Sequence, residues 1–122
     1  MNDRFKFRVY IKYAKMMCYD VNSFYIDRLK NKITIHFDDH TKTFKFNDIV
    51  LEQSTGLKDK NGKLIYEGDI LDNISIDEQY EVRWDEDTAS FCCIMDNEIY
   101  YFDNFDVTAF EIIDNIHENK GV

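Results

Sequence analysis

The 122-residue chain contains no proline, only four glycines and three cysteines. Its turns must therefore be built by asparagine, aspartate and those few glycines. No apolar run approaches the length of a membrane span, and the N-terminus, with Asp3 and alternating charges, lacks the apolar core of a signal peptide. We therefore expect a soluble protein of the cytoplasm, with no membrane association.

The few cysteines also exclude a disulfide framework. Cys18 and the adjacent Cys92 and Cys93 form no CxxC pair, and neighbouring residues of a strand point to opposite faces. Reduced, buried thiols are the expected state.

Hydrophobic residues make up 44% of the chain and aromatic residues 16%, which predicts a packed interior rather than disorder. The length fits one domain over residues 1–122, with two small subdomains sharing one core as the alternative. The net charge of −9 is unevenly distributed. Residues 1–66 hold 13 Lys and Arg against 8 Asp and Glu, a net +5, whereas residues 67–122 hold 2 against 16, a net −14. The chain thus has a basic half and an acidic half.

Apolar and polar residues alternate near the N-terminus, which predicts a strand with Phe5, Phe7 and Val9 in the core. The same reasoning places Trp84 in the core. Further short strands are predicted at 16–19, 21–26, 33–37, 43–46, 49–51, 70–76, 79–84, 89–95, 98–102 and 110–113. Turn signals recur every 8 to 12 residues or so, and no sustained 3.6-residue period is present. We predict an all-β fold, a barrel-like sandwich of short antiparallel strands, with at most one helical turn at residues 104–109.

The most specific stretch is Gln53 to Leu71, QSTGLKDKNGKLIYEGDIL, which holds three of the four glycines. Asn61-Gly62 lies at the centre of a four-residue turn and predicts a type I′ hairpin, in which both central residues have positive φ. Gly56 and Gly68 mark further places where the chain bulges or reverses.

This stretch resembles the central signature of the YopX family, in which TGLKDKNG is followed by IYEGDIV. The opening RFKFR followed by Met16-Met17 is similar to the family's KFRAWD…KM, and FEIIDNIHEN at 110–119 is similar to its closing FEVIGNIYEN. Two positions depart from the pattern: Asp114 stands where the family usually has Gly, and His117 where it has Tyr. The resemblance spans the chain. It implies a small protein encoded by phages or prophages of Gram-positive bacteria, with an all-β, barrel-like sandwich.

Few residues point to chemistry. His36, Asp38 and His40 have the residue types and spacing of metal ligands on one face of a strand, but a solvated hairpin tip explains them better, and we predict no metal site. His117 is expected on the surface. The cysteines have no histidine close in sequence, and Gly56 to Gly62 lacks the GK[ST] ending of a phosphate loop. We therefore expect no enzymatic activity and no cofactor.

Binding is the better hypothesis. Acidic turns of the second half would present carboxylates to a basic groove on a host or phage protein, such as a factor that handles nucleic acid or acts in defence. The predicted contact residues are Asp77, Glu78, Asp85, Glu86, Asp87, Asp96 and Glu98. Plain solubility is the simpler explanation of the same charges.

Two other binding modes follow from the charge split. The basic half, with aromatics interleaved among Arg4, Lys6 and Arg8, could bind nucleic acid as small barrels do. The net charge of −9 opposes this unless the two halves are segregated in space. Pairing of the basic half of one copy with the acidic half of another would give a homo-oligomer.

Overall fold

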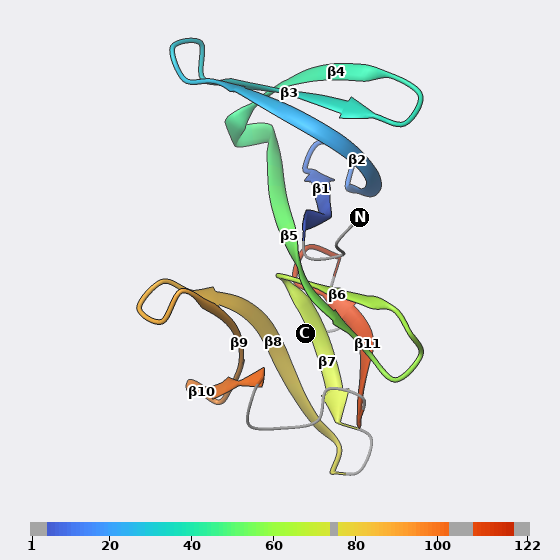
Figure 1. Cartoon of the computed structure of the whole chain (residues 1–122), viewed down its shortest axis with the longest axis vertical. Coiled ribbons are helices and arrows are strands. Elements are labelled where there is room, and N and C mark those ends of the chain that lie inside the picture. Colours follow the sequence, from blue (N-terminus) through green and yellow to red (C-terminus); the bar gives the residue numbers. More distant parts are fainter. Residues whose placement is uncertain (1–4, 74–75, 103–108, 119–122) are drawn as a thin grey trace.

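The computed structural model describes residues 5–73, 76–102 and 109–118, and in these residues the chain is all-β (Figure 1). A 3-10 turn, η2, covers Phe46–Asp48. The strands are β1 (Phe7–Ile11), β2 (Met16–Asp27), β3 (Lys32–Phe37), β4 (Thr41–Lys45), β5 (Ile49–Lys58), β6 (Leu64–Tyr66), β7 (Asp69–Asn73), β8 (Glu78–Asp85), β9 (Ser90–Met95), β10 (Glu98–Tyr101) and β11 (Phe110–Asn115). Within the described ranges no helix is long and apolar enough to cross a membrane.

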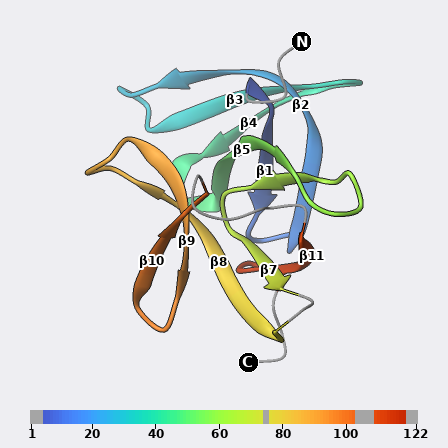
Figure 2. The ribbon, with the colours of Figure 1, turned by 60° about the horizontal axis from the view of Figure 1, so that its bottom comes forward.

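The described strands form two antiparallel sheets. The first has the order β4-β3-β2-β1-β5-β6 and the second has the order β10-β9-β8-β7-β11. Neither is closed into a barrel, which confirms the all-β sandwich class predicted from the sequence. Both views place β1 and β5 between the β2–β4 hairpins and the second sheet (Figure 1 and Figure 2).

The first sheet curls over its own hydrophobic cluster. Bulges interrupt the register of β1 with β2 and of β2 with β3, and such bulges bend and twist a strand. The sheet can therefore bury one of its faces against itself. The cluster comprises Val9, Ile11, Ile33, Ile35, Phe37, Phe44 and Ile49.

The second sheet packs on the end of the first. Ile65 of β6 joins Leu71, Val82, Cys93 and Phe110 of the second sheet in a separate cluster, which is completed by Tyr80. The described residues thus form two hydrophobic clusters rather than one shared core. β5 belongs to the first sheet along its whole length and leads directly into the second cluster through β6.

The charge boundary in the sequence coincides with the boundary between the sheets. The last strand of the first sheet ends at Tyr66, and the first strand of the second sheet begins at Asp69. The basic half therefore forms the first sheet, and the acidic half supplies the strands of the second.

Two core predictions were wrong. The side chain of Phe5 is 63% exposed and that of Trp84 is 40% exposed, whereas Val9 is fully buried and Phe7 half-buried. Phe5 precedes the first strand, and Trp84 lies at the end of β8, beyond the hydrophobic cluster that covers Tyr80.

The predicted strands are confirmed to within a residue or two at most of their ends, with three corrections. The strand predicted at 70–76 ends at Asn73, and Ile76 lies in a turn. The stretches at 16–19 and 21–26 form one strand, β2, with a bulge between Val21 and Ser23, because a bulge absorbs the break without a turn. The strand predicted at 49–51 continues to Lys58. The helical turn predicted at 104–109 falls largely outside the described residues.

Candidate functional site

The two sheets meet at a buried arginine. Strand alternation turns Arg8 away from Val9 and toward the second sheet, where its side chain is only 1% exposed. Arg8 Nε donates to Glu52 Oε1 at 2.8 Å, and a terminal nitrogen donates to Asp69 Oδ1 at 2.6 Å. The other terminal nitrogen donates to the Glu67 carbonyl at 3.1 Å. One side chain of β1 is thereby bonded to β5 and to the segment that opens the second sheet.

Aromatic rings enclose the Arg8 guanidinium. Its central carbon lies 4.9 Å from the ring centroid of Tyr66 and 5.8 Å from that of Tyr19, which are distances for cation–π attraction. Burial lowers the pKa of Arg8, but the facing carboxylates Asp69 and Glu52 outweigh this effect and raise it. The guanidinium is permanently charged.

His117 completes the cluster. Its Nε2 lies 2.8 Å from Glu52 Oε2, and its ring is stacked on Tyr10 at 4.8 Å between centroids. The side chain is 14% exposed, so the prediction that His117 lies on the surface was wrong. The reason is tertiary: the turn after β11 returns to β1 and β5, a contact that local sequence does not encode.

The hydrogen bonds of this buried cluster join the two sheets to each other. Burial raises the pKa of Asp69, and the Arg8 charge and the Tyr66 amide donor partly offset that rise. Asp69 Oδ2 also accepts the Tyr66 backbone N–H at 2.8 Å. The donors and acceptors of Arg8 and Asp69 therefore point at other residues of the cluster, and their role is to hold the two sheets together.

The turn of the central stretch is held by Asp59. Its carboxylate accepts the backbone N–H groups of Asn61, Lys63 and, across the fold, Ile112. Gly62 has φ +78 and its N–H donates to the Asp59 carbonyl at 3.0 Å. Asn61 does not have positive φ, so the predicted type I′ turn was wrong and the side chain of Asp59 sets the turn instead.

Asp59 gives a first testable prediction. Desolvation would raise the pKa of this carboxyl, but the three backbone donors outweigh desolvation and lower it. We expect Asp59→Asn to lower the free energy of unfolding by about 1–3 kcal/mol at pH 7, because an amide nitrogen would then face a backbone N–H. The folded pKa is depressed, so this contribution is present above the unfolded pKa and is lost as pH falls through the folded pKa.

Urea unfolding at pH 7, 5 and 3 measures this effect. The difference between wild type and Asp59→Asn should shrink toward pH 3. Asp20→Asn, at an exposed position, is the control and should change stability little at any of these pH values. A wild-type advantage that persists undiminished at pH 3 would contradict the role assigned to the carboxylate.

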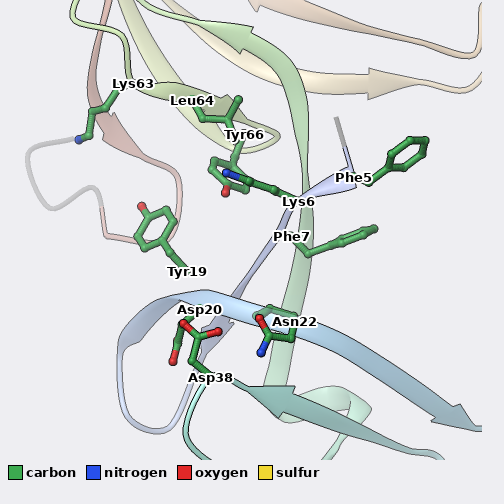
Figure 3. A pocket seen from close by; sticks show the side chains of 11 residues that line it. Phe5, Lys6, Phe7, Tyr19, Asp20, Asn22, Asp38, Lys63, Leu64 and Tyr66 are labelled. Carbon is green, nitrogen blue, oxygen red and sulfur yellow. The ribbon is translucent and has the colours of Figure 1, made fainter. Parts of the chain in front are cut away.

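A groove lies beside the junction of the two sheets, which is the cluster around Arg8, Glu52 and Asp69 (Figure 3). It has a volume of about 550 Å³ and is lined by aromatic residues together with Lys6, Lys63, Asp20 and Asp38. Tyr19 lines one side, while Phe5 and Phe7 point together to the other side of β1. The two lysines are matched by two carboxylates, so the groove does not favour a phosphate backbone. Nucleic-acid binding by the basic half stays a prediction.

The predicted acidic contact residues fall at two ends of the second sheet. Asp85, Glu86 and Asp87 lie at and after the end of β8, and Asp85 accepts the Tyr101 hydroxyl at 2.7 Å. The other four, Asp77, Glu78, Asp96 and Glu98, lie at the β7–β8 and β9–β10 turns, at the start of β8. Glu78 to Asp85 spans roughly 23 Å at about 3.3 Å per residue. The structure therefore divides the predicted surface into two separate groups.

The group at the start of β8 is linked by two tyrosines. Tyr80 donates to Glu78 at 2.8 Å and Tyr100 donates to Glu98 at 3.0 Å, and their rings are 5.5 Å apart in an edge-to-face arrangement. Asp96 and Asn97 both have positive φ. The backbone signs of a type I′ turn thus occur at Asp96-Asn97 rather than at Asn61-Gly62.

The two histidines among the candidate metal ligands have other partners. His36 Nδ1 lies 2.9 Å from Thr41 Oγ1, and His40 Nδ1 lies 2.6 Å from Asp39. Among the described residues no group of three or more His, Cys, Asp and Glu is placed to hold a metal ion.

The cysteines are free thiols. Cys92 and Cys93 are buried and Cys18 is half-buried. Burial, with a smaller effect of Cys92, raises the pKa of Cys93 to about 12. Cys93 is therefore protonated and unreactive near neutral pH.

The described residues define a class: a small all-β protein whose two antiparallel sheets are fastened by buried ion pairs. The profile of the YopX protein family matches residues 6–121, so the chain belongs to the YopX family. The fold is also similar to the crystal structure of protein EF1440 from Enterococcus faecalis, with 27% sequence identity, a TM-score of 0.65, and coverage of 93% of this chain and 94% of that chain. No curated protein matches the chain.

Sequence reasoning missed the residues that fasten the sheets. Alternation of apolar and polar residues predicts that Arg8 faces solvent, because a strand with this alternation is expected to have one buried face. In the structure both faces of β1 are covered. One signal was available: Glu67-Gly68-Asp69 places charges beside a glycine inside the family signature. Glycine is favoured where another group approaches the backbone closely, as Glu52 approaches Gly68.

Proposed function

We propose that this protein is a non-enzymatic, phage- or prophage-encoded interaction module whose acidic second sheet binds a basic surface on a protein of the bacterial cytoplasm. A host factor that handles nucleic acid or acts in defence is the partner class with such a surface. One observation carries the proposal: the change of charge sign falls at the boundary between the sheets. From Glu67 onward the described residues hold 14 Asp and Glu against Arg83, a net charge of −13, and they supply the strands of the second sheet.

The physical basis is electrostatic. Carboxylates concentrated on one sheet create a directional field that accelerates encounter with a basic surface and suppresses acidic partners. The exposed tip formed by Glu86 and Asp87 extends this charge into solvent. The buried ion pair of Arg8 with Asp69 contributes indirectly, since it joins the basic sheet to the acidic one and so fixes their relative orientation.

A charge-reversal experiment tests the proposal. The tip variant combines Asp85→Lys, Glu86→Lys and Asp87→Lys. In affinity capture from host cells we expect the amount of partner bound to fall at least about tenfold, because several charges at the interface are reversed. Its capture should also depend less on salt. Mass spectrometry identifies the partner, and capture at 50, 150 and 500 mM NaCl measures the salt dependence.

The matched control makes the same change of charge on the first sheet. Asp20→Lys, Asp38→Lys and Asp39→Lys alter exposed acids and should leave capture within about twofold. Capture of the same amount of partner by the tip variant as by the wild type would contradict the proposal. A mobility shift of DNA or RNA by the wild-type protein at low salt would instead support nucleic-acid binding by the basic half.

A further inference from the structure

Trp84 occupies an unusual position on β8. Tyr80 and Val82, on the same face of the strand, are buried in the second hydrophobic cluster, whereas Trp84 is 40% exposed. The Gly68 N–H donates to the Val82 carbonyl at 2.8 Å. The segment around Gly68 thus contacts β8 at Val82, and Trp84 is the next residue on the same face of the strand, beyond that contact.

The exposed indole forms one wall of a crevice between the sheets. Trp84 is paired across the β8–β9 ladder with Phe91, and their rings lie 4.9 Å apart, edge to face. Phe7 and Leu51 of the first sheet complete the apolar lining, and the crevice has a volume of about 270 Å³. Phe5, which points to the same side as Phe7 in Figure 3, is 63% exposed and adds to the apolar surface on that side of β1.

Polar and acidic groups accompany the apolar rings of this crevice, and Gln53 belongs to its lining. Glu67 contributes to its lining, and Asp85, Glu86 and Asp87 directly follow Trp84 in the β8–β9 hairpin. Burial, and then the neighbouring Glu52 charge, raises the pKa of Glu67, and the backbone hydrogen bond from Gln53 and the Arg8 charge only partly offset this rise. A cation near the crevice would be attracted by Asp85, Glu86 and Asp87 of the adjoining hairpin, and by Glu67 when that carboxyl is ionised.

We propose that this crevice is the anchor point for the protein partner, and that it receives a single Leu- or Phe-sized side chain from a Lys- and Arg-rich segment. The inference rests on the proposed function and names the chemistry of the contact. Aromatic residues in small pockets dominate interface energies. The volume of 270 Å³ is below the range of roughly 300–1,000 Å³ typical of small-molecule sites, which favours one side chain over a cofactor.

Trp84 provides its own reporter, because it is the chain's single tryptophan. The probe is the synthetic peptide Lys-Lys-Arg-Leu-Lys-Lys-Arg. One matched peptide replaces Leu by Gly, and another replaces every Lys and Arg by Gln. Only the peptide that combines charge with leucine should shift the emission of Trp84 to shorter wavelength with a saturable dependence on concentration.

Variants separate the apolar contribution from the charged one. With a dye-labelled peptide, Trp84→Ala and Phe91→Ala should each raise Kd at least about tenfold, the loss expected for an aromatic anchor. Asp85→Asn, Glu86→Gln and Asp87→Asn together should raise Kd and flatten its salt dependence. Asp77→Asn, Asp96→Asn and Glu98→Gln remove the same charge at the other end of β8 and should have less than half that effect on the logarithm of Kd. Circular dichroism verifies that each variant is folded.

The outcomes distinguish the crevice from the broader proposal. Equal binding of the leucine and glycine peptides, unaffected by Trp84→Ala, would overturn the crevice while leaving the acidic surface intact. Failure of every peptide to bind would also overturn the crevice, whereas the proposed function is decided separately by capture of the tip variant. Self-association that the leucine peptide displaces would identify a second copy of this chain as the occupant and overturn the assignment to a basic partner.

Discussion

Replacing Arg8 with methionine should lower the free energy of unfolding at pH 7 by about 3–5 kcal/mol, the loss expected when one partner of a buried ion pair is removed. Methionine preserves much of the side-chain volume but leaves the buried carboxylates of Glu52 and Asp69 without their cation. The Glu67 carbonyl also loses a donor. The loss of stability in Arg8→Met therefore comes from buried carboxylate charge that has no cation to balance it, rather than from a cavity.

This origin predicts a characteristic pH dependence. In the wild type, burial already raises the pKa of Asp69, and Arg8 partly restrains the rise. Without Arg8 the folded pKa of Asp69 should rise further above the unfolded value of about 3.9. The folded variant then binds a proton more readily than the unfolded chain, so its stability increases as pH falls from 7 toward 4. The difference from wild type should narrow over that range.

Urea unfolding at pH 7, 6 and 5 measures both effects. Arg83→Met is the matched control, because Arg83 pairs with Glu81 in an exposed ion pair, and it should change stability by no more than about 0.5 kcal/mol. A loss for Arg8→Met that stays constant across these pH values would show that lost packing, not unpaired charge, causes the destabilisation.

Local patterns predicted most of the fold. Alternation along Lys32–Phe37 and the Asp96-Asn97 turn identify a strand and a hairpin because the determining interactions lie within a few residues. The same patterns failed where a strand extends beyond the residues that pack on it. Alternation assigns Trp84 to the buried face of β8, but the described residues leave the end of that face partly exposed. Periodicity states which residues share a face and not how far the opposing layer extends.

The junction could not be predicted for a different reason. Arg8 bonds to residues 44 and 61 positions away along the chain, and His117 reaches Glu52 over 65 positions. Contacts at such separations depend on how the two sheets pack. From the sequence, Glu52 and Asp69 were two carboxylates among 24 acidic residues, and only packing distinguishes them from the solvated ones.

Gly68→Ala should lower the free energy of unfolding by roughly 2–5 kcal/mol. Gly68 has φ +91, a conformation that costs an L-residue about 1–2 kcal/mol. A Cβ at this position would also overlap Glu52 Oε2 and lie 3.0 Å from Glu52 Cδ. Glu52 cannot withdraw without loss, because Arg8 and His117 hold its two oxygens, and overpacking a rigid site adds about 1–3 kcal/mol.

A second glycine separates these two contributions. Gly62 has φ +78, but a Cβ added there would have no described atom beyond its chain neighbours within 4 Å, so Gly62→Ala carries the backbone cost alone, about 1–2 kcal/mol. The excess loss in Gly68→Ala, measured by urea unfolding at pH 7, reports the clash with Glu52. Combining Gly68→Ala with Glu52→Gln should not relieve the clash, because glutamine has the same shape, whereas Glu52→Ala removes it. If Gly68→Ala costs less in the Glu52→Ala background than in the wild type, the glycine of the signature is required because the buried carboxylate lies against it; equal costs in both backgrounds would assign the requirement to backbone conformation alone.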